Sequence, residues 1–487
     1  MTTRPFPVSG ARLARHGVSL TAIFLFCLSY WIHRYFGQLD VNQIAYHLNF
    51  GVDIVRTSDP VFTKRFIRWC VAAPCIFLAL LAYAERRLVG ALGRLPRFWR
   101  PMLCRLYRQL PYVLLAAAAG FWLWDVSALK YVGASFGPNY FGANYVRPAS
   151  VALVEKQAKN LILIYVESLE AGYADRGAFG RDLIAPLSGL HGASFPAYEQ
   201  APGTGWTIAA LVATQCGVPL ERVTIFDGNT QGQMMDSFLS KAVCLPDLLA
   251  QRGYRNVFMG GASARFAGKD KFLRQHHYHE IYGKEEWLQR GASEGGMNGW
   301  GLYDAELFRE AKAKLRALSA SKQRFNLSLL TVDTHEPGGT QSAQCTQAGY
   351  ARGFDGIVSC TAAEVADFVR FAQQQGYLEN TNIVILGDHL ARRNPLSAQL
   401  DQMPRRAIFN SFVARDTPAP QRSQLLHFDL MPTILEFAGY TVRGGRLGLG
   451  YSGFSRDAQP PPDRLRRMER DLLNRSAEYL ALWADPD

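Results

Sequence analysis

The sequence predicts an α/β domain with a mostly parallel central sheet flanked by helices, preceded by transmembrane helices. Three dense apolar runs lie before residue 130, and short continuous apolar runs alternate with helical segments over most of the remaining chain. Continuous apolar runs of strand length are typical of strands that are buried on both faces of a parallel sheet. Alternation of such strands with helices is typical of α/β domains.

The positive charge of the 487-residue chain is concentrated near its N-terminus. Residues 1–130 contain 16 Lys and Arg against 5 Asp and Glu, whereas the remaining residues contain 37 against 36. A basic excess beside apolar runs sets the orientation of membrane helices. The net charge of +12 therefore gives no support to a nucleic-acid partner.

Residues 1–130 are expected to form a membrane domain with three helices, at about residues 17–33, 66–84 and 111–129. Each run is close to the roughly 20 residues that span a bilayer, and no small-residue cleavage site follows the first one. Core helices of a soluble protein are the alternative, but they do not explain the arginines between the second and third runs. These mark a cytoplasmic loop and place both the N-terminus and this loop inside, and the chain after residue 129 outside. They are Arg86, Arg87, Arg94, Arg97, Arg100, Arg105 and Arg108.

Three further segments follow the membrane domain. Residues 131–159 are expected to be a linker, 160–460 a catalytic domain, and 461–487 one Arg-rich amphipathic helix that packs on the domain or lies on the membrane. A helix is also expected over Thr361–Gln375, because Thr361 and Glu364 have the spacing of a capping box. The expected strands lie at residues 161–166, 257–259, 327–332 and 383–386.

The eight cysteines divide between the two regions. Cys27, Cys70, Cys75 and Cys104 lie in or beside the apolar runs, where a thiol is usually a small apolar residue. In an oxidising compartment the other four could pair as Cys216–Cys244 and Cys345–Cys360, each closing a short loop. Four unpaired thiols remain the alternative, and none of the four has the C-x-x-C spacing of a zinc site.

Carboxylates and histidines follow three of the expected strands. Glu167 follows the first, the run Asp333-Thr334-His335-Glu336 follows another, and Asp388-His389 follows the last. Ligands of α/β sheets bind beyond the carboxyl ends of the strands, so these side chains are expected to meet. Such a set can bind a divalent cation and leave a histidine for proton transfer, although single residues of this kind are often only caps or loop residues.

Thr207 is the candidate nucleophile. It follows a glycine-rich turn, Gly203-Thr204-Gly205-Trp206, and precedes a helix-forming stretch. A helix N-terminus of this kind offers N–H groups and a positive dipole end to a phosphate. Thr207 could coordinate the metal and attack phosphorus, or it could be only the N-cap of the helix.

Several other polar and aromatic residues are weaker candidates. His427 could touch the site, and Trp300 and Tyr303 could line a substrate cleft or only pack. His276, His277 and His279 look like a metal tract, but they are expected to lie in a surface turn.

Seven collinear motifs resemble the lipoteichoic acid synthase and phosphoglycerol transferase I group of the alkaline-phosphatase/sulfatase superfamily. They extend over roughly residues 138–455, and the closer resemblance is to phosphoglycerol transferase I, which decorates osmoregulated periplasmic glucans. The motifs are YVESLE (165–170), GTGWTIAALVATQCGVPL (203–220), GASARFAGKDKFL (261–273), NGWGLYD (298–304), LTVDTHEPGG (330–339), GDHLARRN (387–394) and GLGYSGFS (448–455).

The resemblance implies roles for individual residues. Glu167, Thr207, Asp388 and His389 would bind the metal, Mn²⁺ first, with Mg²⁺ or Zn²⁺ as alternatives. Thr207 would be the nucleophile, and His335 would contact substrate and serve the leaving group. Lys269, Trp300 and His335 would bind substrate. Lys269 stands where lipoteichoic acid synthases have an arginine, and Ala267 where they have a tryptophan, which favours the glucan-modifying branch.

The resemblance also implies the reaction and its place in the cell. A bacterial inner-membrane enzyme, with its N-terminus in the cytoplasm and its catalytic domain in the periplasm, would move sn-1-phosphoglycerol from phosphatidylglycerol to a glycan. Diacylglycerol would leave as a phosphoglyceryl-threonine forms. The family's enzymes extend well beyond the catalytic domain, whereas this sequence ends at Asp487, so an acceptor other than an osmoregulated glucan is possible.

Three alternatives remain at this point. A phosphoethanolamine transferase acting on lipid A would share the fold, the metal and the threonine, but the FAGKD, NGWGLYD and VATQCG segments disfavour it. A sulfatase lacks its required context, because Cys244-Leu245-Pro246-Asp247 fails at the last position of C-x-P-x-R. An inactive membrane-anchored sensor or scaffold would not need competent residues at every metal and nucleophile position.

Overall fold

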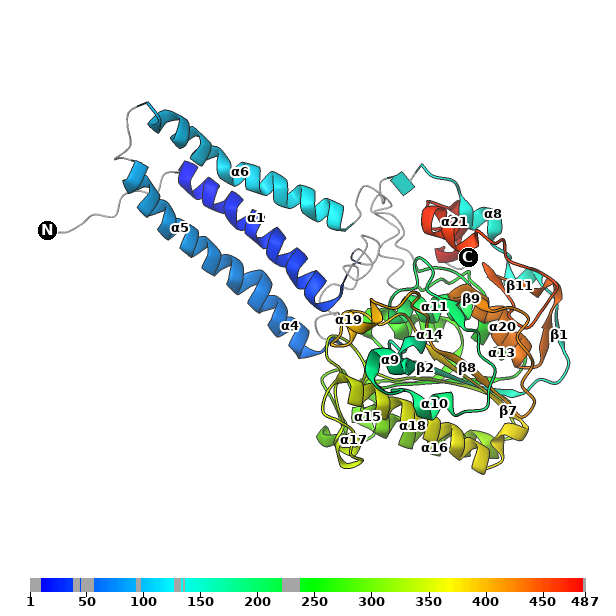
Figure 1. The fold of residues 1–487 in the computed structure, drawn as a ribbon. Coiled ribbons are helices and arrows are strands. Elements are labelled where there is room, and N and C mark those ends of the chain that lie inside the picture. The colour runs from blue at the N-terminus through cyan, green and yellow to red at the C-terminus, as the bar shows by residue number, and fades with distance from the viewer. Residues whose placement is uncertain are drawn as a thin grey trace. The chain divides into compact units, whose positions relative to one another are not determined.

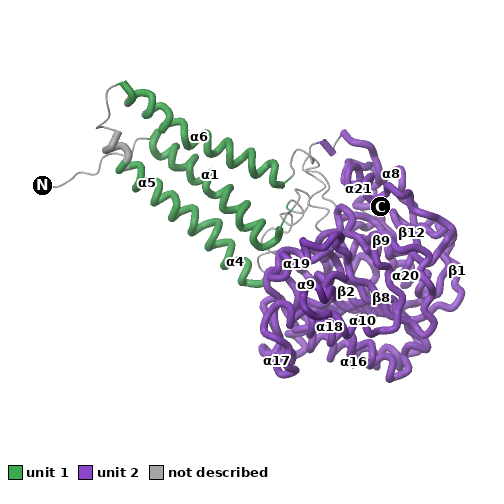
Figure 2. The backbone as a smooth tube through the Cα atoms, in the orientation of Figure 1, with its two compact units in different colours: residues 1–44, 59–132 green, residues 45–58, 133–487 purple. Residues whose placement is uncertain are grey.

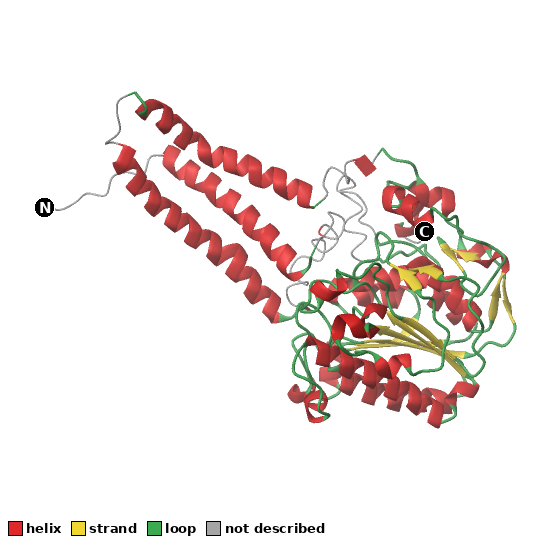
Figure 3. Cartoon of the chain, viewed as in Figure 1, coloured by secondary structure: helices red, strands yellow, loops and turns green. Residues whose placement is uncertain are grey.

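The structure, a computed structural model, describes residues 10–37, 44, 57–92, 98–126, 133–134, 136–220 and 237–484. The chain divides into two compact units (Figure 2). One comprises residues 1–44 and 59–132, and the other residues 45–58 and 133–487. The first unit is helical, and the second contains strands and helices (Figure 3).

Long helices form the first unit, in which α1 packs against both α5 and α6. Among the described residues, Gly10–Tyr35 and Pro60–Glu85 are long and apolar enough to cross a membrane, and they overlap the first two predicted spans. Most of the third predicted span lies in α6, but its residues 127–129 are outside the described part of the chain. Residues 93–97 of the predicted cytoplasmic loop are also outside it. The third span and the loop therefore stay predictions. The helices are α1 Gly10–Tyr35, α4 Pro60–Phe66, the π-helix η1 Ile67–Ala72, α5 Ala73–Leu92 and α6 Arg100–Asp125.

A sheet lies at the centre of the second unit (Figure 1). It has six strands, in the order β5-β4-β6-β2-β7-β8. Neighbouring strands are parallel except for β7 and β8, which are antiparallel. All residues of β2, β6 and β7 are buried, which confirms the α/β fold predicted from their continuous apolar runs. The strands are β2 Asn160–Val166, β4 Arg255–Gly260, β5 Tyr278–Tyr282, β6 Phe325–Leu330, β7 Thr381–Gly387 and β8 Asn410–Val413.

Helices cover both faces of the sheet. Successive residues of a strand point to opposite faces, so Leu163 and Tyr165 of β2 enter one hydrophobic core while Ile162 and Ile164 enter the other. The first core contains residues of α11 Thr207–Cys216, α13 Leu245–Ala250, α14 Lys269–Gln275 and α20 Leu430–Phe437. The second contains residues of α10 Ala185–Ser188, α16 Asp304–Ala320 and α18 Phe354–Gln374.

Short elements complete the second unit. Three two-stranded pairs are β1 Leu153–Glu155 with β10 Tyr440–Val442, β3 Ala197–Glu199 with β9 Gln424–Leu426, and β11 Arg446–Leu447 with β12 Gly450–Tyr451. The short helices are α8 Tyr140–Asn144, α9 Arg176–Phe179, α15 Lys284–Gln289, α17 Ala343–Gln347, α19 Ser397–Leu400, α21 Arg464–Asp471 and α22 Ala477–Leu480.

Three predicted boundaries differ from the structure. The expected linker 131–159 contains α8, whose Phe141 is buried, and β1, which pairs with β10, so its described part belongs to the folded unit. The helix expected over Thr361–Gln375 begins at Phe354. Thr361 lies inside it, where its hydroxyl donates to Asp304, so it is not the N-cap. The single helix expected over 461–487 is divided into α21, α22 and the 3₁₀ turn η9 Ala481–Trp483.

A buried ion pair attaches α21 to the second unit. Arg464 and Asp429 are 5% and 1% exposed, and Arg464 Nη1 donates to both carboxylate oxygens of Asp429 at 2.8 and 3.0 Å. Met468 and Leu472 follow at helical spacing and enter the first core. The C-terminal segment therefore packs on the domain.

We expect Arg464→Met to lower the free energy of unfolding by about 3–5 kcal/mol, because it leaves Asp429 as a buried charge without its partner. The measurement is urea denaturation of the detergent-solubilised full chain. Arg467→Met is the matched control, since Arg467 pairs with Asp463 at the surface, where both side chains are about half exposed. Equal shifts of the urea midpoint in the two variants would contradict the role of the buried pair.

Candidate active site

The parallel pairing of β2 with β7 brings two carboxylates together. Val166 pairs with Gly387 at the carboxyl ends of these strands, so Glu167 and Asp388 follow side by side. Gly387 passes close to the loop after β2, where an added Cβ would lie 2.0 Å from the backbone oxygen of Leu169. Only glycine tolerates this approach, and without it Asp388 could not lie beside Glu167.

Glu167, Asp388 and His389 form the centre of the site. Each offers one potential ligand atom, and these atoms lie within 4.8 Å of one another. His389 Nε2 is 3.5 Å from Glu167 Oε1 and 3.5 Å from Asp388 Oδ2. His389 Nδ1 lies 2.9 Å from the carbonyl oxygen of Leu390, to which it donates, and this directs Nε2 toward the two carboxylates.

The electrostatics of this centre suit a divalent cation. Asp388 is fully buried, and its Oδ2 has no hydrogen-bond partner among the described residues. Burial raises the pKa of Asp388 to about 7, and burial together with the charge of Asp388 raises the pKa of Glu167. Buried carboxylates are costly without a compensating positive charge, and carboxylate plus imidazole is a ligand set that Mn²⁺ and Zn²⁺ accept.

Thr207 is the first residue of α11, and Trp206 in extended conformation is the N-cap. Thr207 therefore does not cap the helix, as its alternative interpretation required. Its Oγ1 donates to Glu167 Oε2 at 3.3 Å. The structure thus brings Glu167, Thr207, Asp388 and His389 together at the positive end of a ten-residue helix, where an anion is stabilised.

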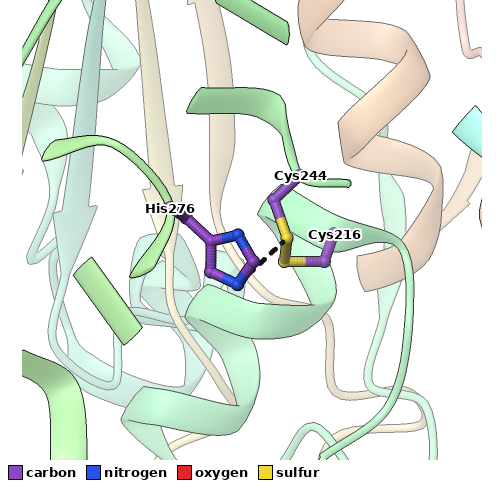
Figure 4. A group of neighbouring side chains, drawn as sticks. All are labelled: Cys216, Cys244 and His276. Atoms are coloured by element: carbon purple, nitrogen blue, oxygen red, sulfur yellow. Dashed lines mark hydrogen bonds between the residues drawn. A yellow bond between two sulfur atoms is a disulfide. The ribbon is translucent and has the colours of Figure 1, made fainter. Parts of the chain in front are cut away.

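A disulfide lies at the other end of α11. Cys216, the last residue of the helix, is joined to Cys244, the N-cap of α13 (Figure 4). The second pair named above, Cys345 and Cys360, is also joined. Buried His276 lies beside the first disulfide, with Nε2 3.7 Å from Cys244 Sγ (Figure 4). Disulfide sulfurs are not thiolate ligands, so these three residues form no metal site.

The candidate histidine tract is also not a cluster of ligands. His276 and His277 bond to opposite oxygens of the Asp247 carboxylate, each at 2.8 Å. His279 Nδ1 accepts the backbone N–H of Asn256 at 3.1 Å. His276 and His277 therefore share Asp247 as a structural partner, and His279 bonds to the backbone of Asn256.

The predicted substrate-binding residues lie in a group of neighbouring aromatic and cationic side chains. The Trp300 ring lies 4.3 Å from that of His335 and 5.3 Å from that of Phe266. Lys269 donates to the backbone oxygen of Phe266 at 3.1 Å and lies over its ring. Lys269 is 3% exposed, and burial lowers its pKa to about 8. The roles of Lys269, Trp300 and His335 in binding substrate stay predictions.

His335 is suited to proton transfer. Its Nδ1 donates to the backbone oxygen of Glu336 at 2.9 Å. Burial opposes protonation, but the carboxylates of Glu336 and Glu167 outweigh burial and raise the pKa of His335. A protonated imidazole beside a phosphate ester can donate a proton to the leaving group.

Three residues that sequence reasoning left unassigned or weak also belong to this region. Glu336 is 6% exposed, with Oε1 3.8 Å from Arg392 Nε, and Arg392 Nη2 donates to the backbone oxygen of Gly205 at 2.6 Å. His427 is buried, and its Nε2 donates to the backbone oxygen of Asp388 at 2.8 Å. The only sequence signal for Glu336 and Arg392 is their place in the strand-end motifs, close to His335 and His389.

Asp333 also follows a strand, but it bonds elsewhere. Its carboxylate accepts from the side chain of Asn298 at 2.9 Å and from the backbone N–H of Asp304 at 3.2 Å. Asn298 in turn accepts the backbone N–H of Trp300 at 2.8 Å. Asp333 therefore supports the loop of Trp300 instead of joining Glu167 and Asp388.

Comparison with known proteins identifies a family. The family model described as Sulfatase matches residues 159–440. The chain is 37% identical over 361 residues to phosphoglycerol transferase I of Citrobacter koseri, and 36% identical over 358 residues to that of Shigella flexneri. Each match covers 71% of this chain and 45% of the relative, so the chain spans less than half the length of the curated relatives it matches.

A solved structure is also similar. It is a protein in the alkaline phosphatase superfamily from Vibrio parahaemolyticus, with 17% identity and a TM-score of 0.49 over 74% of this chain and 96% of that chain. The family resemblance inferred from the seven motifs is confirmed by the family model and the curated relatives.

We expect Asp388→Asn to abolish the stabilisation that Mn²⁺ gives to the wild-type protein. At a metal concentration of 100 times Kd, binding stabilises the folded state by about 2.7 kcal/mol, which is a Tm rise of several degrees. After chelation, the variant should melt no lower than wild type, because it removes an uncompensated carboxylate. The measurement is Tm with and without Mn²⁺.

Glu364→Gln is the control, since Glu364 is a half-buried carboxylate on α18, outside the predicted ligand set. It should keep the full response to Mn²⁺. An unchanged Mn²⁺ response in Asp388→Asn would show that the cation binds elsewhere.

Proposed function

The chain belongs to the sulfatase family, and from that premise we propose that it transfers phosphoglycerol from phosphatidylglycerol to a glycan through Thr207. Two relatives at 37% and 36% identity carry the name phosphoglycerol transferase I, which supports the phosphoglycerol group as the transferred moiety. An osmoregulated periplasmic glucan is the proposed acceptor, and diacylglycerol is the proposed product.

The position of the Thr207 hydroxyl carries this proposal. It lies 3.3 Å from Glu167 Oε2, at the N-terminus of α11 and beside the pair formed by Asp388 and His389. A nucleophile needs a group that receives its proton and an environment that stabilises charge on the phosphate. Both conditions are met around Thr207.

In the first half of the proposed reaction, Thr207 Oγ1 attacks the phosphorus of phosphatidylglycerol. The hydroxyl proton leaves toward Glu167, a new bond joins Oγ1 to phosphorus, and the bond from phosphorus to the diacylglycerol oxygen breaks. His335 donates a proton to that oxygen. A divalent cation, Mn²⁺ first, held by Glu167, Thr207, Asp388 and His389 would lower the pKa of the hydroxyl and offset negative charge on the phosphate.

In the second half, a hydroxyl of the glycan attacks the same phosphorus. His335, now neutral, accepts the proton of the attacking hydroxyl, and the bond between phosphorus and Thr207 Oγ1 breaks. Glu167 returns its proton to Thr207 Oγ1, and the phosphoglyceryl glycan leaves. His335 thus acts as acid in the first half and as base in the second. The second half forms a bond from phosphorus to an alcohol oxygen of the kind that the first half breaks, so the proton moves in the opposite direction.

The two disulfides and the apolar helices support a location for this reaction. Both disulfides lie in the second unit, and disulfides persist in oxidising compartments such as the bacterial periplasm. We propose that Gly10–Tyr35 and Pro60–Glu85, together with the predicted third span, hold the chain in the inner membrane. The second unit would then face the periplasm, where the donor lipid is available in the outer leaflet.

We expect wild-type protein in detergent, incubated with phosphatidylglycerol and Mn²⁺ without acceptor, to gain the mass of one phosphoglycerol group and to release diacylglycerol. Thr207→Ala should give neither product, because no hydroxyl remains to attack phosphorus. Intact-mass spectrometry and lipid chromatography measure the two products.

Thr214→Ala is the matched control, since Thr214 lies on the same helix but is fully buried and donates to the backbone oxygen of Ala210. This variant should still form the adduct. A phosphoethanolamine adduct on the protein, formed only when phosphatidylethanolamine is the donor, would identify a phosphoethanolamine transferase. No adduct with either lipid would refute the transferase proposal.

The rate of adduct formation at subsaturating phosphatidylglycerol should fall as the pH rises above about 8. The pKa of Lys269 is lowered to about 8, so the amine loses its proton, and its attraction for the phosphate, above that pH. One deprotonation gives about a tenfold fall per pH unit. Lys269→Arg should make this decline shallower, because arginine stays charged and only the proposed acid His335 still loses its proton over this range. Equal pH profiles for the two proteins would exclude Lys269 as the phosphate-binding cation.

A further inference from the structure

Glu336 has an unused acceptor atom in a carboxylate close to Glu167 and His335. Its side chain is 7% exposed, and its Oε2 is buried without a hydrogen-bond partner in the described part of the chain. A buried acceptor without a donor is costly, so an oxygen of this kind points to a group that arrives with the ligand. The proposed transfer steps make no use of Glu336.

The position of Glu336 places this atom in the reaction site. One potential ligand atom from each of Glu167, His335 and Glu336 lies within 4.8 Å of the other two. Glu167 is also the acceptor of the Thr207 hydroxyl. The Glu336 carboxylate therefore borders the space in which the phosphoglycerol group would be attached to Thr207.

Arg392 holds Glu336 in this position. The Arg392 Nε atom lies 3.8 Å from Glu336 Oε1, while its Nη2 donates to the backbone oxygen of Gly205, two residues before Thr207. The guanidinium thus links the loop of Glu336 to the turn that precedes the nucleophile. It faces Oε1, and Oε2 stays available.

The protein itself does not satisfy Oε2. His335 Nδ1 is 3.7 Å away, and its hydrogen is directed to the backbone oxygen of Glu336 at 2.9 Å. Arg392 already supplies a full positive charge beside this carboxylate, so a cationic ligand group is not needed to balance it. A neutral hydroxyl, which donates a hydrogen bond without adding charge, is the group that suits Oε2.

On the premise of the proposed phosphoglycerol transfer, we propose that Glu336 Oε2 accepts a hydrogen bond from a polyol hydroxyl, so that Glu336 determines specificity for polyol substrates. The hydroxyl belongs either to the glycerol head group of the donor or to a sugar of the acceptor. A site built to bond a hydroxyl rejects an analogue that lacks it, since the buried acceptor is then left unpaired.

The test compares two donors in single-turnover reactions with Mn²⁺ and no acceptor. Phosphatidylglycerol carries two head-group hydroxyls, and phosphatidylpropanol carries the same three carbons without them. Intact mass distinguishes the two adducts on Thr207. If the glycerol head group supplies the hydroxyl, wild type should react at least about tenfold faster with phosphatidylglycerol. Glu336→Gln should then reduce this preference to threefold or less, since a charge-assisted hydrogen bond is lost.

The preference is a ratio measured within one preparation, so it does not depend on the fraction of folded protein. Glu294→Gln is the matched control, because Glu294 is an exposed glutamate in a short 3₁₀ turn. It should keep the wild-type ratio.

A second arm separates the two sources of the hydroxyl. The adduct formed from phosphatidylglycerol is mixed with a glucose oligosaccharide or with 1-propanol, and the loss of adduct mass is followed. In one outcome, Glu336→Gln keeps the donor ratio, while its ratio of adduct-loss rates with the sugar and with propanol falls by about tenfold. The acceptor then supplies the hydroxyl. If only the donor ratio falls, the glycerol head group supplies it.

Two results would overturn this inference. Wild-type ratios for both the donor and the acceptor in Glu336→Gln would show that Oε2 meets no substrate hydroxyl. A second bound Mn²⁺ in wild type that Glu336→Gln loses, measured by metal content, would show that Oε2 is a metal ligand. Absence of any adduct on the wild-type protein would instead refute the proposed function on which the inference rests.

Discussion

The parallel pairing of β2 with β7 is the constraint on which the site depends. It aligns Val166 with Gly387, so the next residue of each strand is a carboxylate at the same edge of the sheet. Two apolar cores cover the strands up to that edge, which forces Glu167 and Asp388 to be buried. The register of one strand pair therefore determines both the proximity of the carboxylates and their exclusion from water.

This burial is only partly offset by the protein. Asp388 Oδ1 accepts the backbone N–H groups of Ser168 and His389, and Glu167 Oε1 accepts the hydroxyl of Ser168. Ser168 makes these bonds from a left-handed conformation with φ of 55°, which is unfavourable for a residue other than glycine. Asp388 Oδ2 remains without a partner among the residues described. The buried carboxylates therefore lower the free energy of unfolding, and a bound cation would offset this cost. For this reason Glu167 and Asp388 destabilise the fold without a cation but suit a cation as ligands.

The sequence predicts the parts of this arrangement that depend on local pattern. Continuous apolar runs identify β2, β6 and β7, and the polar residues that follow them include Glu167, Asp388 and His389. The start of α18 was missed because Phe354 follows Gly353, whose φ of 138° and not a capping side chain marks the boundary. The pairing of β1 with β10 was missed because it joins short segments almost 300 residues apart, and local pattern carries no information on such contacts.

Glu336 and Arg392 lie in motifs named from the sequence, but they received no role there for the same physical reason. Both lie in loops after strands, and only the three-dimensional course of those loops brings Glu336 Oε1 to 3.8 Å from Arg392 Nε. Asp333 shows the converse, since it has the sequence context of a ligand but bonds to Asn298 and to the backbone of Asp304. A strand-end position therefore predicts that a residue is near the site, whereas its partners decide what it does there.

The helix that begins with Thr207, the proposed nucleophile, is held at both ends. At the C-terminus of α11, the disulfide from Cys216 to Cys244 joins the helix to α13, and before the N-terminus Arg392 donates to the backbone oxygen of Gly205. Between these points almost the whole helix is buried in the first core. Thr207 is thus held at a rigid helix start and not in a loop, which limits the reorganisation needed when charge develops on phosphorus. Because Arg392 also faces Glu336, one side chain contacts both the turn before Thr207 and the proposed hydroxyl acceptor, so the proposed attack and the proposed substrate selection would depend on the same guanidinium.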